Sequence, residues 1–168
     1  MTIAGLLNNA RALKQGLDDG KLMQAVLEPH GADIIEQQRI QLLEGKAADG
    51  TDMHPFYSED VKPHGYFKSQ HTAQNYAAWK QSLSYPYSVQ RKPDAPNLYI
   101  TGVFHNDLNV EFSAVGVGIV PDTAYAANIM AKYGKNAFGL CQEKWGVIFN
   151  EKGVRDELIT KVKQTLWQ

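Results

Sequence analysis

The sequence has little of several features that would identify a function at once. It contains a single cysteine, Cys141, which excludes an internal disulfide and a thiolate metal cluster. Uncharged stretches such as 95–106 and 112–121 are shorter than the ~20 apolar residues that cross a bilayer, and both contain Pro or Gly. The amino terminus has no basic segment ahead of an apolar run. We therefore expect no membrane span and no secretory signal, and synthesis in a cytosol.

An excess of charge of one sign is also missing. The chain has 17 Lys and Arg against 18 Asp and Glu, a formal net charge of −1, and both signs occur along both halves. Such a chain has no field that would attract nucleic acid or an anionic membrane. With 168 residues, 43% of them hydrophobic and 21% charged, it has the material for one domain, spanning 1–168, with a core.

The first 44 residues predict helices. Apolar residues recur at helical spacing from Ile3 to Leu13 and stop before Gly16, which predicts a short amphipathic helix. A second helix carries Leu22 to Leu27, with Asp18 or Asp19 as its cap, and ends at Pro29. A third is expected over 32–44.

The segment 45–97 behaves differently. Its prolines and glycines interrupt any long regular element, and only 69–83 could be helical. A disordered segment would be poor in aromatics, yet this one holds eight of the 17 in the chain. We interpret it as an extended arm that docks on its own domain or on a neighbouring subunit. The candidate interface residues in it are Tyr57, Tyr66, Phe67, Trp79, Tyr85 and Tyr87.

The remaining chain mixes strand and helix patterns. The stretches 98–104 and 109–120 predict a hairpin or a pair of strands, followed by a helix over 124–133. The last apolar pattern is interrupted at Gly153 and fits two helical pieces or one bent helix. Its end, with Leu158, Ile159, Val162 and Leu166, should pack on the sheet or on a neighbouring subunit, and Trp167 is a further interface candidate. The fold class expected is α+β.

Motifs that would carry chemistry are weak. His54, Asp60, His64 and His71 fall in one segment, but their spacing in a Pro-rich loop does not aim them at one point, so we predict no metal. Cys141 has no C-x-x-C partner and is expected to be a buried small hydrophobe. We predict no catalytic residue and no cofactor.

The order of several short motifs is more informative than any one of them. A Thr-Gly turn within 99–104 precedes a Gly-Val-Gly strand at 116–118, a Tyr-Ala helix from 125 that ends in Tyr-Gly at 133–134, and a Phe-x-Leu step at 138–140. Upstream, 43–45 and 49–53 have a helix exit and a Gly turn. This order resembles small tailed-bacteriophage morphogenesis and tail-completion proteins, over about half to two thirds of the chain.

The resemblance implies a structural virion protein, made in the host cytoplasm, that forms a ring of identical copies at the head-tail junction or the tail end. Its partners would be copies of itself and neighbouring portal, connector or tail proteins. Two other classes stay open: a phage-associated hydrolase or nuclease that uses His54, Asp60, His64 and His71, and a small binding module of the host.

Overall fold

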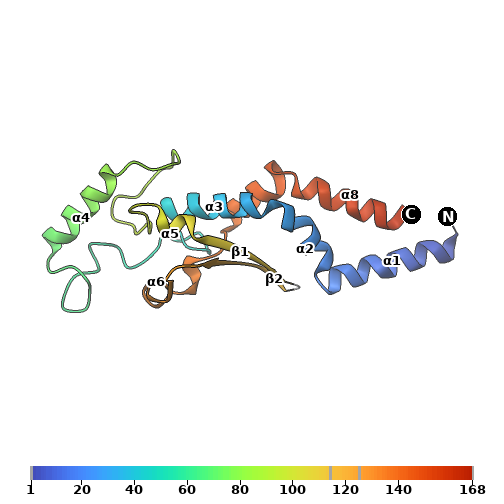
Figure 1. The fold of residues 1–168 in the computed structure, drawn as a ribbon, viewed down its shortest axis with the longest axis horizontal. Helices are drawn as coiled ribbons and strands as arrows, with labels where there is room; N and C mark the ends of the chain where they lie inside the picture. The colour runs from blue at the N-terminus through green and yellow to red at the C-terminus, as the bar shows by residue number, and fades with distance from the viewer. Residues whose placement is uncertain (1, 114, 125, 168) are drawn as a thin grey trace.

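The computed structural model describes residues 2–113, 115–124 and 126–167. The molecule is elongated, and three zones follow one another along its long axis (Figure 1). A body built around the hairpin lies in the middle, an arm with α4 (Gln70–Ser82) lies at one end, and α1 (Ile3–Asp18) and α8 (Val154–Trp167) project from the other end. Both chain termini therefore lie at the same end.

The amino-terminal helices form as predicted, with different bounds. α1 continues through Gly16 to Asp18, and the chain turns at Gly20, whose φ of 71° is left-handed. α2 (Lys21–Leu27) follows; Asp19 accepts a hydrogen bond from the Lys21 backbone N–H at 3.1 Å. A single 3₁₀ turn (Glu28–His30) then leads into α3 (Gly31–Leu43).

The sheet is smaller than expected. β1 (Leu108–Ser113) and β2 (Gly116–Pro121) pair antiparallel, with Leu108 opposite Pro121 and Ser113 opposite Gly116. Both strands come from the second of the two stretches that predicted them. The prediction of a strand over 98–104 was wrong, because Leu98 has a φ of 51° and Gly102 a φ of 85°, and the short helix α5 (Val103–Asn106) begins there.

The body core lies between α3, the hairpin and the segments that follow it. At its start α3 approaches β1 so closely that a Cβ on Gly31 would lie 3.1 Å from Val110 Cγ1, so glycine permits this packing. The buried cluster combines residues from the whole chain: Val26, Leu27, Ile34, Ile35, Leu42, Met53, Phe104, Leu108, Ile119, Ala137, Leu140, Ile148 and Val154. An α+β fold with one main core results.

The carboxyl-terminal part contains α6 (Ala126–Tyr133), a 3₁₀ turn (Lys135–Ala137), α7 (Gln142–Gly146), a π-helical turn (Val147–Glu151) and α8. Tyr125, with which the Tyr-Ala motif of the predicted helix begins, lies outside the described residues. Gly153, with a φ of 84°, separates the last two helical pieces, one of the two predicted arrangements. α8 packs mainly on α1 and α2 rather than on the sheet, which corrects one expectation; its Leu158 also borders the body core.

Candidate interaction surfaces

Two aromatic residues that we predicted at an interface form a small core inside the arm. Tyr57 and Phe67 are buried, together with Ala73 and Ala77 of α4. Tyr76 completes the cluster: its ring centroid lies 5.1 Å from that of Tyr57 and 5.2 Å from that of Phe67. Burial raises the pKa of Tyr57. A partner would therefore reach these two side chains only after the arm opens.

The other predicted arm residues are more accessible. Tyr66 is 76% exposed and Trp79 is 43% exposed, whereas Tyr85 and Tyr87 are half-buried. Tyr85 is held in place, because its hydroxyl donates to the Lys80 carbonyl at 2.7 Å and the Arg91 guanidinium lies over its ring at 4.1 Å. Tyr66 and Trp79 are the two arm aromatics that present most surface to a partner.

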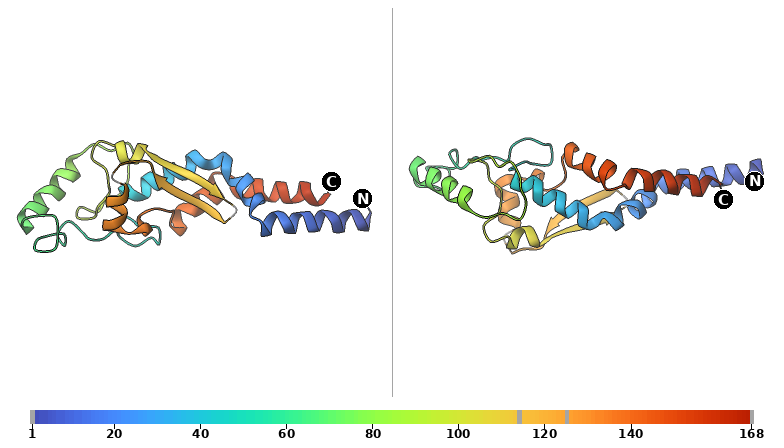
Figure 2. Two further views of the ribbon diagram at one scale, coloured as in Figure 1. Left: turned by 60° about the horizontal axis from the view of Figure 1, so that its bottom comes forward. Right: turned by 90° about the horizontal axis from the view of Figure 1, so that it is seen from above.

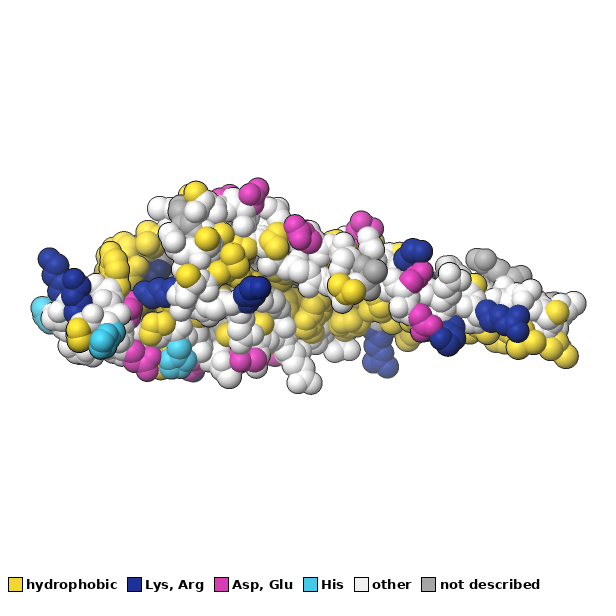
Figure 3. Space-filling model, turned by 90° about the horizontal axis from the view of Figure 1, so that it is seen from below, with side chains coloured by type: hydrophobic (Ala, Val, Ile, Leu, Met, Phe, Trp, Pro, Cys, Tyr) yellow, Lys and Arg dark blue, Asp and Glu magenta, His cyan; other side chains and the backbone are white. Residues whose placement is uncertain are grey.

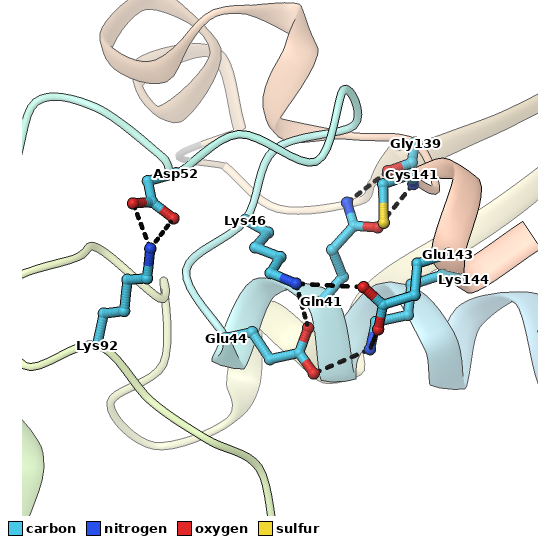
Figure 4. Close-up of polar contacts among 9 residues, drawn as sticks. All are labelled: Gln41, Glu44, Lys46, Asp52, Lys92, Gly139, Cys141, Glu143 and Lys144. Atoms are coloured by element: carbon cyan, nitrogen blue, oxygen red, sulfur yellow. Dashed lines mark hydrogen bonds and ion pairs between the residues drawn. The ribbon is translucent and has the colours of Figure 1, made fainter.

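Local structure explains why the arm is ordered. α4 begins with a capping box in which Ser69 and Thr72 satisfy each other's backbone N–H groups, so the predicted helix forms. The two ends of the arm are tied together where the Tyr57 N–H donates to the Asp94 carbonyl and the Ser58 N–H to its carboxylate, both at 3.0 Å. Asp52 and Lys92 form an ion pair across the same junction (Figure 4).

Polar contacts, several of them buried, anchor the beginning of the arm to the body (Figure 4). The Gln41 side chain, fully buried in α3, donates to the Gly139 carbonyl and accepts from the Cys141 N–H, each at 2.8 Å. Beside it, Lys144 Nζ lies 2.9 Å from Glu44 Oε1, and Lys144 is 6% exposed. Lys46 binds Glu143 at 3.3 Å and lowers the pKa of that carboxyl. These contacts fix the exit of α3 and the entry of α7.

A buried lysine marks the junction of arm and body. Lys80 of α4 is 2% exposed and donates to the Tyr99 carbonyl, and burial lowers its pKa to about 8. It lines a cavity of about 430 Å³ together with Tyr57, Tyr76 and Tyr133. Nearby, His105 is bound to the Asn97 carbonyl at 2.9 Å, and burial lowers its pKa to about 4.

The opposite end of the molecule, which we call the stalk, consists of α1 and α8. They lie side by side and antiparallel in both views of Figure 2, and the Asn9 amide donates to the Leu166 carbonyl at 3.3 Å. No residue of 3–18 is buried, and in α8 only Val154 is. Leu158, Val162 and Leu166 are half-buried, whereas Trp167 is 68% exposed.

The apolar stripe of α1 does not face α8. At about 100° per residue, the stripe is centred roughly a quarter turn from the side that carries Asn9. Ile3 is 82% exposed, Leu7 53% and Leu17 49%. Figure 3 shows hydrophobic side chains along one edge of the stalk and on the adjoining underside of the body. The apolar stripe consists of Ile3, Leu6, Leu7, Ala10, Leu13 and Leu17.

The stripe leads into an apolar groove at the base of the stalk. This groove has a volume of about 490 Å³ and lies between α2, the tip of the hairpin, and the turn after α7. Its apolar walls are formed by Leu17, Met23, Leu27, Phe112, Val115, Val117, Trp145 and Phe149. The amphipathic pattern of α1 is visible in the sequence; the groove, made from four separate segments, is not.

The residues of the hydrolase alternative are dispersed among other contacts. His54 Nδ1 lies 2.9 Å from Glu59, Asp60 pairs with Lys132, and His71 contacts Asn75 at 3.1 Å. His64 is exposed. Within the described parts of the chain, no three His, Cys, Asp or Glu side chains are placed to hold a metal ion. Cys141 is buried, as predicted.

No helix among the described residues is both long and apolar enough to cross a membrane. Comparison of the chain with protein-family models, with curated proteins and with solved structures finds no match.

Proposed function

We propose that this protein is a structural component of a tailed-bacteriophage virion, and that identical copies form a ring at the head-tail junction or the tail end. The order of motifs from the Thr-Gly turn to Leu140 supports the phage setting. The observation that carries the proposal is the apolar stripe of α1, of which every member but the half-buried Leu13 is exposed. Fully burying a large apolar side chain is favourable by about 1.5 to 3 kcal/mol relative to leaving it exposed, so contacts that cover the stripe stabilise an assembly.

A ring requires two different contact surfaces on each subunit, because head-to-tail contacts between identical copies join unlike patches. The stalk and the arm lie at opposite ends of an elongated molecule (Figure 1). The arm presents Tyr66 and Trp79, and the stalk presents the apolar stripe of α1. A net charge of −1 adds little repulsion between copies. The ring would contact portal, connector or tail proteins on its two faces.

The mass of the purified full-length chain in solution tests this proposal. Native mass spectrometry and light scattering over a range of protein concentrations should give a closed assembly of one fixed copy number, and negative-stain microscopy should show rings. A chain that stays monomeric at the highest soluble concentration, with or without portal and tail proteins, contradicts the proposal. An assembly with a continuous distribution of sizes would indicate open filaments and contradict the ring.

A further inference from the structure

Two uncharged apolar surfaces of this chain match each other in character. The first is the amino-terminal half of α1, because residues 2–10 contain no Asp, Glu, Lys or Arg and expose Ile3, Leu6 and Leu7. The second is the groove at the base of the stalk, where the described residues that line it also carry no charge. A charged side chain at either surface would oppose docking of an apolar helix, and neither surface has one.

These two surfaces cannot meet within one molecule. α1 borders the groove at Leu17 and then extends away from the body, so its first residues lie at the far end of the stalk (Figure 1). From Leu17 back to Gly5 the rise of an α-helix, about 1.5 Å per residue, gives a separation of roughly 18 Å. The first turns of α1 can therefore fill this groove only in another copy of the chain.

We infer that the amino-terminal half of α1, through Ile3, Leu6 and Leu7, docks in the groove of a second copy, against Met23, Val117 and Trp145. This contact rests on the proposed ring and specifies that the groove, rather than the arm, receives the apolar stripe. An amphipathic helix that lays residues i, i+3 and i+4 into an apolar groove is a common mode of recognition. The contact joins unlike patches, so each subunit gives one helix and accepts one, as a ring requires.

The size of the contact predicts its strength. The whole of α1, with 16 residues, is about 24 Å long and about 10 Å wide, so one face covers roughly 240 Å² in projection, and its amino-terminal half covers roughly 120 Å². Stable pairs bury about 800 Å² on each partner, which is well above what one helix face supplies. Each contact should therefore be weak alone, and assembly should depend strongly on concentration until the ring closes.

Two variants with single defects test this inference. In the stripe variant, Leu7→Asp places a charge on the apolar stripe at a position that is 53% exposed. In the groove variant, Val115→Asp combined with Gln24→Glu adds charges to two groove residues, one of them 97% exposed and the other changed without a change of volume. Each should weaken self-association at least about 100-fold, because a charge would be buried at the contact. The matched control is Asn8→Asp, the neighbouring exposed residue away from the stripe.

Mixing the two variants gives the sharpest result. The stripe variant keeps a normal groove, and the groove variant keeps a normal stripe, so neither assembles alone. Because one contact is weak, an equimolar mixture should form a 1:1 heterodimer in light scattering at the highest soluble protein concentration. Circular dichroism should show that both variants keep the helix content of the wild type. A groove variant that assembles normally overturns the inference, because assembly would then use another surface. A mixture that stays monomeric also overturns it, because the intact stripe and the intact groove would then not bind each other.

The outcome for the wild type separates this inference from the proposed function. If the wild type forms rings and both variants form them equally well, the docking of α1 in the groove is wrong and the ring remains. If the wild type never assembles at any soluble concentration, the ring and the docking contact are both wrong. Asn8→Asp should assemble like the wild type; a defect as large as that of Leu7→Asp would show that charge anywhere on α1 blocks assembly, and would also overturn the inference.

Discussion

The two ends of the molecule both carry many apolar side chains and use them in different ways. In the arm, Tyr57 and Phe67 are buried in a small core of their own, and hydrogen bonds join the two ends of the segment. In the stalk, no residue of α1 is buried, and Ile3 and Leu7 face outward. Aromatic richness therefore indicated internal packing as much as contact with a partner. The leucines of α1 leave a larger exposed apolar surface than the aromatic residues of the arm do.

The largest expected effect of a single substitution is in the arm core. Phe67→Ala should destabilise the arm by roughly 3 to 5 kcal/mol, because it removes a buried aromatic from a small cluster. Hydrogen exchange should show loss of protection across α4 while α3 in the body remains protected. Tyr66→Ala is the matched control, because Tyr66 is the neighbouring residue and is 76% exposed. This substitution should lower the stability of the arm by less than about 1 kcal/mol. Equal effects of the two changes would show that the arm lacks a core.

The second largest loss of stability is expected at the polar anchor between arm and body, the ion pair of Lys144 and Glu44. Lys144→Met removes the 2.9 Å partner of the largely buried Glu44 carboxylate, which keeps Lys46 at the longer distance of 3.9 Å, and this loss should cost about 3 kcal/mol in urea unfolding. Lys152→Met removes a more exposed pair with Asp33, where the expected loss is below about 1 kcal/mol. The stability difference between these two variants measures the anchor. If both lose the same amount, the buried position of Lys144 contributes nothing.

A pH dependence should also distinguish the arm from the stalk. Burial lowers the pKa of Lys80 from 10.5 to about 8, so between pH 8 and pH 10 the unfolded state binds more protons at this group than the folded state. Stability should therefore rise with pH in this window, by roughly 2 kcal/mol. Above about pH 10 the buried tyrosines, whose pKa values are raised, act in the opposite direction.

Chemical unfolding of the wild type and of Lys80→Met at several pH values between 8 and 10 measures this contribution. The variant should lose the rise in stability, because it has no proton to release. It should keep the packing of α4, because Met has a similar length. An unchanged slope in the variant would assign the pH dependence to other groups.

The smallest effect on the free energy of unfolding should come from the stalk. Leu7→Ala, at a position that is 53% exposed, should change the stability of the dilute monomer by less than about 0.5 kcal/mol, since it removes little packing and alanine favours helix. The same change should nevertheless weaken assembly in light scattering. A stability loss comparable to that of Phe67→Ala would mean that the stripe packs within its own subunit.

Local patterns were enough to predict several elements. The Ser69 to Leu83 pattern predicted α4, which has a capping box, and the alternation over 109–120 predicted the strands that pair there. Gly153 marked the break before α8. The strand predicted at 98–104 failed because its apolar composition did not reveal the left-handed backbone of Leu98.

The sequence alone determined most of the longer helices and which of them has an apolar stripe, because these properties depend on neighbours three and four residues away. Only the tertiary structure decided which apolar residues are covered. Asn9 turns toward α8 and the leucines turn outward, while Tyr57 and Phe67 turn inward upon α4. Burial depends on segments distant in the chain, as in the groove that α2, the hairpin and Trp145 form together. No periodicity within one segment records that arrangement.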